Sequence, residues 1–205
     1  TASNNTAVGD SALGANTTGA DNNAVGSGAL LSNTTGGDNN AFGRGALENN
    51  VSGIGNTAMG HGALADNNAN DNTAYGKVSL RYNTTGTANV AVGLDALRFN
   101  TTASNNTGIG YYALRANTTG ADNTGVGYGV FVNSTTAFEN TAIGRNAGGA
   151  LTTGNSNVYV GRYAGTHKVS HQTGARCTFI GANSDASTSG ATDAQVLGFD
   201  VTGSG

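Results

Sequence analysis

The sequence has little of what ordinary globular domains are built from. Its 205 residues include no proline, no tryptophan and one cysteine, and only 10% are charged. The single cysteine, Cys177, excludes an internal disulfide framework. No apolar run approaches the roughly 18 residues that a membrane span needs, and nothing at the N-terminus is typical of a signal peptide. The net charge of -3 gives no electrostatic footprint for nucleic acid or an anionic membrane, and no membrane insertion by this segment is expected. The first residue is Thr1, which suggests a piece of a longer chain.

What the sequence does contain is 34 glycines and a repeat. The stretch NNTAVGDSALGANTTG, residues 4–19, recurs as DNNAVGSGALLSNTTG and as DNNAFGRGALENNVSG. The spacing is 17 residues, except for 16 residues between Gly60 and Gly76 and 20 between Gly161 and Gly181. A fixed period of this length is the signature of a stacked repeat architecture. The glycine that ends each copy of the motif is found at Gly9, Gly26, Gly43, Gly60, Gly76, Gly93, Gly110, Gly127, Gly144, Gly161, Gly181 and Gly198.

Four features of the repeat are nearly constant when the units are aligned on this landmark glycine. Three and four residues after it comes an Ala-Leu pair in most units, and a turn-like NTTG follows. Four residues before each of the first ten glycines is an asparagine: Asn5, Asn22, Asn39, Asn56, Asn72, Asn89, Asn106, Asn123, Asn140 and Asn157. One residue before it is a large apolar side chain: Val8, Val25, Phe42, Met59, Tyr75, Val92, Ile109, Val126, Ile143, Val160, Ile180 and Leu197.

This pattern predicts an all-β fold, a parallel β-solenoid of about twelve coils of 17 residues. We expect a strand of about five residues, a turn at the glycine, a second short strand through Ala-Leu and a turn at NTTG. Disorder is disfavoured because the scarce apolar residues keep a strict register, and helix is disfavoured by the frequent glycines. Residues 1–165 form the regular solenoid in this interpretation, and residues 166–205 form irregular terminal coils that serve as a cap or a junction.

Stacking gives the two main columns a structural role. Identical asparagines in adjacent coils can bond to one another along the rod, so the asparagine column predicts a structural ladder. The Ala7 and Val8 columns are both apolar, yet neighbouring strand residues face opposite sides. A strand that is apolar on both faces is normally buried on both. One face therefore meets the Leu13 column inside the coil, and we expect the other to meet another chain.

The repeats resemble those of a known class of fibrous proteins. The recurring NTAVG, NTAMG, NTAIG and NVAVG, each followed after two residues by Ala, resemble the head repeat of trimeric autotransporter adhesins of the YadA type. The NTTG-linked unit, CTFIGANSDAS and QVLGF also resemble repeats of bacterial and phage tail-fibre proteins. The unit is longer than the adhesin repeat, and Thr or Asn replaces its usual Val. The resemblance implies a left-handed homotrimer on a cell or virion surface, hence extracellular, acting as a shaft or adhesive head.

Variable columns are where a solenoid carries its function. In coils seven to ten, the two positions after the landmark glycine contain an aromatic and arginine cluster, and such residues are enriched in binding sites. The candidate surface consists of Tyr111, Tyr112, Tyr128, Arg145, Arg162 and Tyr163. A host-surface glycan or protein is the expected ligand, although these side chains would equally fill a lateral groove between chains. No cofactor is predicted.

Other functions have weaker support in the sequence. No histidine recurs with a carboxylate or nucleophile, so the chain is not expected to be an enzyme. His167, His171 and Cys177 offer loosely spaced zinc ligands, but a solvated loop is the alternative. The column Asp21, Asp38, Asp71 and Asp122 offers carboxylates for calcium, against Asx-turn capping. Paired threonines such as Thr17-Thr18 leave an ice-binding solenoid, or a purely structural spacer, as alternative functions.

Overall fold

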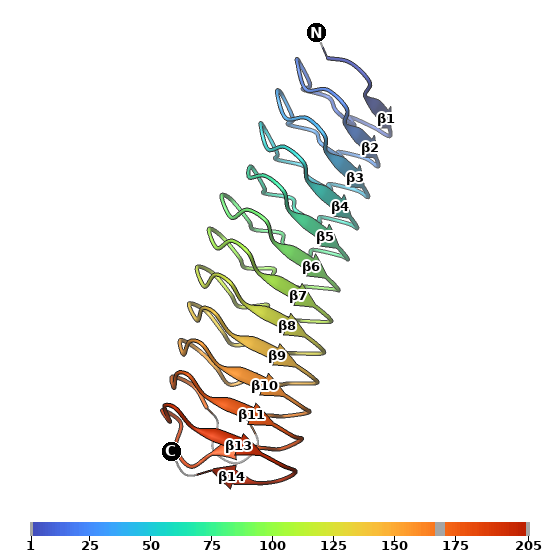
Figure 1. Ribbon diagram of the computed structural model, residues 1–205. Coiled ribbons are helices and arrows are strands. Elements are labelled where there is room, and N and C mark those ends of the chain that lie inside the picture. The colour runs from blue at the N-terminus through green and yellow to red at the C-terminus, as the bar shows by residue number, and fades with distance from the viewer. Residues whose placement is uncertain (1, 167–170, 204–205) are drawn as a thin grey trace.

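The computed structural model describes residues 2–166 and 171–203. The chain winds from one end of a rod to the other, with one short strand stacked on the next in every turn (Figure 1). The described residues contain no helix, and therefore none that could cross a bilayer. The strands are β1 (Thr6–Val8), β2 (Asn23–Val25), β3 (Asn40–Phe42), β4 (Thr57–Met59), β5 (Thr73–Tyr75), β6 (Val90–Val92), β7 (Thr107–Ile109), β8 (Thr124–Val126), β9 (Thr141–Ile143), β10 (Val158–Val160), β11 (Thr178–Ile180), β12 (Asp185–Ala186), β13 (Gln195–Leu197) and β14 (Thr202–Gly203).

Twelve of these strands form one parallel sheet, in the order β1 to β11 and then β13. Equivalent residues of successive repeats are paired, so that Ala24 lies opposite Ala41 and Val25 opposite Phe42. The expected parallel β-solenoid is therefore confirmed. The 20-residue step before β11 leaves this register unchanged, because Tyr159 still pairs with Phe179. Strands β12 and β14 form a separate two-stranded parallel sheet at the C-terminal end.

The landmark glycine makes the corner that ends each strand. Gly26 has a φ of +135°, and its N–H donates to the carbonyl of Val8 in the preceding coil over 2.8 Å. A Cβ at Gly26 would lie 2.6 Å from the carbonyl carbon of Gly43 in the next coil. Both the backbone angle and the close approach of the next coil thus require glycine. Corners on both sides limit the strand to three residues rather than the expected five.

The second strand expected through the Ala-Leu pair is wrong, because that pair lies in a turn. Leu30 and Leu97 have φ values of +51° and +50°, in the left-handed region. Such a conformation costs a non-glycine residue about 1 to 2 kcal/mol. The turn nevertheless places the leucine side chain fully inside the coil, which contributes about 1.5 to 3 kcal/mol. The Leu30 N–H also donates to the carbonyl of Ala46 over 3.0 Å, so the turn still bonds to its neighbour.

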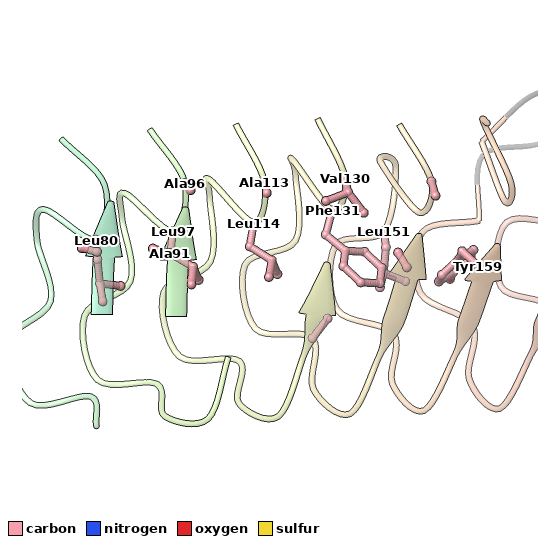
Figure 2. Packing of buried hydrophobic residues seen from close by; sticks show 14 of the residues in the cluster. Leu80, Ala91, Ala96, Leu97, Ala113, Leu114, Val130, Phe131, Leu151 and Tyr159 are labelled. Atoms are coloured by element: carbon pink, nitrogen blue, oxygen red, sulfur yellow. The ribbon is translucent and has the colours of Figure 1, made fainter. Parts of the chain in front are cut away.

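The core is a narrow column of alanine from the strands and leucine from the turns. Ala91 and Leu97 are both completely buried, and the same pairing recurs through the regular coils. Figure 2 shows Leu80, Leu97 and Leu114 at equivalent places in successive coils, followed by Phe131. The alanine face of the strand is thus the inner face, in agreement with the expected contact with the leucine column.

The large core side chain changes its element of origin in coils eight to ten. Glycine follows Phe131 in its column, at Gly148 and Gly165, and the strand column changes from alanine to Tyr159 and then Phe179. A Cβ at Gly148 would lie 2.5 Å from the Phe131 ring, so the volume is already filled. Tyr159 packs edge-to-face on Phe131 with centroids 5.6 Å apart and stacks on Phe179 at 5.4 Å. The core therefore keeps its volume while the two columns exchange their large and small residues.

The predicted asparagine column forms hydrogen bonds along the rod. Asn39 is completely buried, and its backbone N–H and its Nδ2 both donate to Oδ1 of Asn22 over 3.1 Å. Its Nδ2 also donates to the carbonyl of Gly53 over 2.8 Å. The same bonds recur as far as Asn157, whose Oδ1 accepts from the backbone N–H of Cys177 over 2.9 Å. The amides thus satisfy backbone groups that face the coil interior.

A second buried asparagine ladder was not predicted from the sequence. The first residue of each NTTG turns inward, and Asn50 Nδ2 donates to Asn33 Oδ1 over 3.1 Å and to the Gly53 carbonyl over 3.0 Å. Gly53 therefore accepts from both ladders, which ties two corners of the coil together. The members of this ladder are Asn16, Asn33, Asn50, Asn67, Asn83, Asn100 and Asn117. Its signal was the recurrence of Asn before Thr-Thr, which was interpreted only as turn chemistry.

The outer face of the sheet carries an exposed apolar stripe, defined as the column from Val8 to Leu197 one residue before each landmark glycine. Within the single chain, Tyr75 is 55% and Ile143 48% exposed. The column consists of the last residue of every strand in the twelve-stranded sheet. Because the middle residue of each strand faces inward, its large apolar neighbour must face outward.

Candidate binding face

A second exposed face lies beside the sheet and carries most of the basic residues. The chain has nine Lys and Arg residues, and all except Lys168 and Arg176 occupy two columns of the repeat, one and five residues after the landmark glycine. Aromatic side chains lie between them. We call this surface the basic aromatic face; it consists of Arg44, Lys77, Arg81, Tyr82, Arg98, Phe99, Tyr111, Tyr112, Arg115, Tyr128, Arg145, Arg162 and Tyr163.

The structure brings the six predicted surface residues together on this face. Tyr111 and Tyr128 stack with centroids 5.3 Å apart and planes at 6°, and Tyr112 lies 3.9 Å from Tyr111. A hydrogen bond with Tyr112 is the main cause that raises the pKa of Tyr111 to about 12. The geometry thus forms one cluster from rungs that are far apart in sequence.

Two guanidinium groups complete this cluster. Arg145 lies 5.7 Å from the ring centroids of both Tyr128 and Tyr163, and Arg162 lies 5.4 Å from that of Tyr163. Contacts of this kind contribute about 0.5 to 1 kcal/mol each at exposed sites. They hold the arginines beside the rings, and Arg145 and Arg162 are both exposed.

The same arrangement extends toward the N-terminus through residues that the sequence analysis missed. Tyr82 and Phe99 stack with centroids 5.6 Å apart, and the Arg98 guanidinium lies beside this pair, at 5.8 and 5.2 Å from the two centroids. Arg115 lies 5.1 Å from both Phe99 and Tyr112, which joins this part to the predicted cluster. The available signal was the repeated arginine after leucine in LRY, LRF and LRA. The sequence pattern alone does not place these arginines beside the residues that follow the glycine, because the turn between them is seen only in the structure.

A buried carboxylate fixes two of these arginines. Asp95 is 5% exposed, and one of its carboxylate oxygens lies 3.3 Å from both Arg98 Nη1 and Arg115 Nε. Hydrogen bonding to Tyr82, followed by the charge of Asp95, raises the pKa of Arg98 above its usual value. The guanidinium groups are thus held on the face with their positive charge intact.

Three shallow hollows lie along the basic aromatic face. One of about 380 Å³ is lined by Arg44, Glu48, His61 and Arg81, and one of about 360 Å³ is lined by His61, Lys77, Arg81 and Arg98. They share His61 and Arg81 and so form one groove. The third, of about 280 Å³, lies farther along the same columns and includes Tyr163.

The histidine in this groove is neutral and part of its wall. Arg44 Nη2 lies 2.7 Å from His61 Nε2, and because guanidinium can only donate, the ring nitrogen accepts. Burial first, and then the charges of Arg44, Lys77 and Arg81, lower the pKa of His61. The positive charge of the groove therefore comes from its arginines and lysine.

The residues considered for zinc are used otherwise where the structure describes them. His167 lies outside the described residues. His171 is buried, its Nε2 donates to the carbonyl of Ala191 over 3.0 Å, and its Nδ1 accepts from the Tyr159 hydroxyl over 2.6 Å. Cys177 takes the place of the ladder asparagine, and its Sγ lies 3.2 Å from the Ala191 carbonyl. Within residues 2–166 and 171–203, no three His, Cys, Asp or Glu side chains are grouped to hold a metal ion.

The aspartate column considered for calcium forms a left-handed corner before each strand. Asp21 and Asp122 have φ values of +58° and +60°, a conformation that Asp and Asn adopt more readily than most residues. Asp21 accepts from Asn4 Nδ2 over 2.9 Å, and Asp122 accepts from Asn105 Nδ2 over 3.1 Å. The column thus makes the corner opposite the landmark glycine.

The basic aromatic face is the candidate binding surface of the chain. Its chemistry is that of a long, positively charged and aromatic surface on a rigid rod. Comparison with protein-family models, with curated proteins and with solved structures finds no match to this chain.

Proposed function

We propose that the chain is a structural and adhesive segment of an extracellular fibre, which carries its ligand-binding groups on the basic aromatic face. The observation that carries this proposal is the division of labour within each coil. The buried columns repeat with little change, whereas arginine and tyrosine are concentrated on one exposed face. Such a division is typical of solenoids that use a rigid stack to present a binding surface. The resemblance to adhesin and tail-fibre repeats supports a cell or virion surface as its location.

The proposal includes assembly of three copies through the apolar stripe. Soluble monomers rarely expose large contiguous apolar patches, and this stripe follows a sheet of twelve strands. Members such as Met59, Tyr75 and Ile143 are 38%, 55% and 48% exposed within the described residues. Burying them between copies would stabilise a fibre at each coil, with about 25 cal/mol gained per Å² of apolar surface.

Sedimentation equilibrium tests the assembly directly. The whole chain is expected to have the mass of three copies. Replacing Met59, Ile109 and Ile143 together by threonine is expected to raise the dissociation constant of the assembly at least tenfold. Each change removes apolar contact area, while threonine remains compatible with a strand. Ile54→Thr is the matched control, since Ile54 is 46% exposed but lies outside the sheet. A monomeric wild-type chain, or an equal effect of the control, would contradict the assembly.

The threonine ranks do not favour ice binding as a second function. The first threonine of each pair uses its hydroxyl within the rod: Thr17 Oγ1 donates to the carbonyl of Thr34 over 2.8 Å, and Thr84 Oγ1 donates to that of Thr101 over 2.9 Å. These hydroxyls bond to the next coil and are not arranged for a water lattice. A passive spacer differs from the proposed adhesin only in lacking a ligand, so a binding assay decides between them.

A further inference from the structure

The distribution of charge across the rod points to a particular class of ligand. The basic columns follow each strand, whereas an acidic column precedes it, and the sheet separates the two. The acidic column contains Asp21, Asp38, Asp71, Asp122 and Glu139. Four acids, Asp10, Glu48, Asp66 and Asp95, lie in the same turns as the seven basic residues of the basic aromatic face. A chain of slightly negative net charge thus has one side on which positive charge is in excess.

The positive groups follow one another along the rod. Arg44 lies in coil three, Lys77 and Arg81 in coil five, Arg98 in coil six and Arg115 in coil seven, and Arg145 and Arg162 follow in coils nine and ten; coil four carries the neutral His61. Coils of a parallel stack rise by roughly 4.8 Å, so the cations form a line parallel to the rod axis. A line of like charges beside a low-dielectric wall attracts an extended polymer of the opposite sign.

The groove on this face offers a binding site for such a polymer. The two adjoining hollows, of about 380 and 360 Å³, run along coils one to six and are lined by Arg44, Lys77, Arg81 and Arg98. The groove also contains Asp10, Glu48 and Asp95, and Asp95 is paired with Arg98 and Arg115, so Arg44, Lys77 and Arg81 supply its excess positive charge. Guanidinium groups bind carboxylate or sulfate oxygens in pairs.

The aromatic residues distinguish a glycan from a nucleic acid. Single-stranded nucleic acids bind by stacking bases on free aromatic faces. Here Tyr111 and Tyr128 already stack on each other at 5.3 Å, and Tyr82 stacks on Phe99 at 5.6 Å. No such platform is left between these rings, whereas Tyr111 and Tyr128 as whole residues remain 39% and 51% exposed.

From these observations we infer that the basic aromatic face binds an acidic polysaccharide lying parallel to the rod, with its carboxylate or sulfate groups on successive rungs. The inference rests on the proposed adhesive function and specifies its ligand. It assigns the principal contacts to Arg44, Lys77, Arg81 and Arg98, beyond the tyrosine cluster.

Binding of the whole chain to immobilised polymers tests the inference. The probes are heparin, which carries sulfate and carboxylate, alginate, which carries carboxylate alone, neutral dextran, and oligo-deoxythymidine. We expect binding to heparin or alginate and none to dextran, with affinity that falls as salt is added. Preference for heparin over alginate would assign sulfate as the recognised group, and equal binding would assign carboxylate.

The variant Arg44→Gln, Lys77→Gln, Arg81→Gln is expected to weaken this binding by about tenfold to a hundredfold and to flatten its salt dependence. Arg176→Gln is the matched control, because Arg176 is exposed beside Asp193, in the column that precedes the strands. The salt dependence of the wild-type chain gives a readout that does not depend on the folding of any variant. An unchanged affinity in the triple variant, or stronger binding to oligo-deoxythymidine, would overturn the inference.

The mass of the triple variant separates the inference from the proposed function. Loss of assembly on removing these three charges would show that the face serves contacts between chains, and this would overturn the ligand assignment. Binding of a neutral glycan or a protein without any acidic polymer would overturn the inference and leave the adhesive function standing. A monomeric wild-type chain without any ligand would contradict the proposed function itself.

Discussion

Each ladder asparagine satisfies several buried groups at once, so its replacement has a large expected effect. Asn89 Nδ2 donates to Asn72 Oδ1 over 3.1 Å and to the Ala103 carbonyl over 2.9 Å, and its Oδ1 accepts from the backbone N–H of Asn106 over 3.0 Å. Asn89→Ala leaves the Asn106 N–H without this acceptor inside the coil. Each orphaned buried group costs about 1 to 3 kcal/mol, and urea unfolding is expected to show a loss of at least that size.

The matched control for this prediction is an asparagine of the same coil stack that faces solvent. Asn49 is exposed, and its Nδ2 makes one bond, to Asp66 over 2.8 Å. Asn49→Ala is expected to change the free energy of unfolding by less than about 0.5 kcal/mol, as exposed substitutions usually do. Equal effects of Asn49→Ala and Asn89→Ala would show that the ladder bonds contribute nothing beyond their counterparts in water.

At the scale of residues, the sequence predicts the role of a recurring side chain better than it predicts the backbone conformation at that position. The Asn5 to Asn157 column was predicted as a ladder because recurrence and stacking suffice for that step. The left-handed leucine turn, as at Leu30, was not predictable, since an isolated leucine disfavours it. Only the stack makes it favourable, through the bond to Ala46 in the next coil and burial in the common core.

At the scale of elements, the aromatic core around β10 and β11 contains a titratable group. Tyr159 and His171 are buried and hydrogen-bonded to each other, and in the neutral ring Nδ1 accepts from the Tyr159 hydroxyl while Nε2 donates to the carbonyl of Ala191. Burial is the main cause that lowers the pKa of His171 below its usual 6.5, while the bond to Ala191 and the charge of Asp185 oppose it. Stability from the neutral ring is therefore present above about pH 6.5 and is lost as pH falls toward the folded-state pKa.

Thermal unfolding at pH 7.5 and pH 5.5 measures this effect. The wild-type chain is expected to lose stability over this range, at up to about 1.4 kcal/mol per pH unit from one such histidine. His171→Gln is expected to be less stable at pH 7.5 and to lose part of the pH dependence. His61→Gln is the comparison, because the pKa of His61 is also lowered, chiefly by burial. This variant removes the part of the pH dependence that comes from the groove and leaves the part that comes from the aromatic core. If His171→Gln kept the full pH dependence, the assignment to the aromatic core would be wrong.

Element boundaries and the full binding face were only partly predictable. Strands of three residues follow from corners on both sides, and the corner at Asp21 is visible only in the backbone. The cluster of Tyr111, Tyr128 and Arg145 was predictable from adjacent rungs in one column. Arg115 was not, since its contact with Tyr112 requires the turn that folds the fifth residue after the glycine back over the second.

For the whole molecule, the period alone was enough to predict the parallel sheet, and one irregular coil shows where the period can change. The coil from Gly60 to Gly76 has 16 residues and lacks one residue of the NTTG turn. In a regular coil, the Thr101 carbonyl accepts from the N–H groups of Thr84 and Thr85 over 2.8 and 3.1 Å.

The short coil replaces that backbone acceptor with a side chain. Asn68 Oδ1 accepts from the N–H groups of Val51 and Ser52 over 3.1 and 2.9 Å. The asparagine thus restores the bonds to the preceding coil that the missing residue would have made, and the strands on either side remain in register, with Thr57 opposite Thr73. The rod therefore tolerates a change of length at this corner when an amide oxygen is supplied.

Placing an asparagine at the same corner of a shortened regular coil tests whether its amide oxygen compensates for the missing residue. Deleting Thr102 together with Thr101→Asn reproduces the Asn-Asn-Ala order of residues 67–69, and we expect a cooperative transition within a few degrees of the wild-type Tm. Deletion of Thr102 alone removes one turn residue without supplying the side-chain acceptor and is expected to be less stable by about 1 kcal/mol. Deletion of Ala91 from the middle of β6 is expected to abolish cooperative unfolding, because a one-residue slip exchanges the inner and outer faces of the strand. Circular dichroism melts of the three variants measure the order. A rod that tolerates the loss of Ala91 as well as the compensated loss of Thr102 would show that stacking is not fixed by register, and the columns of core, ladder and basic residues would then have no common cause.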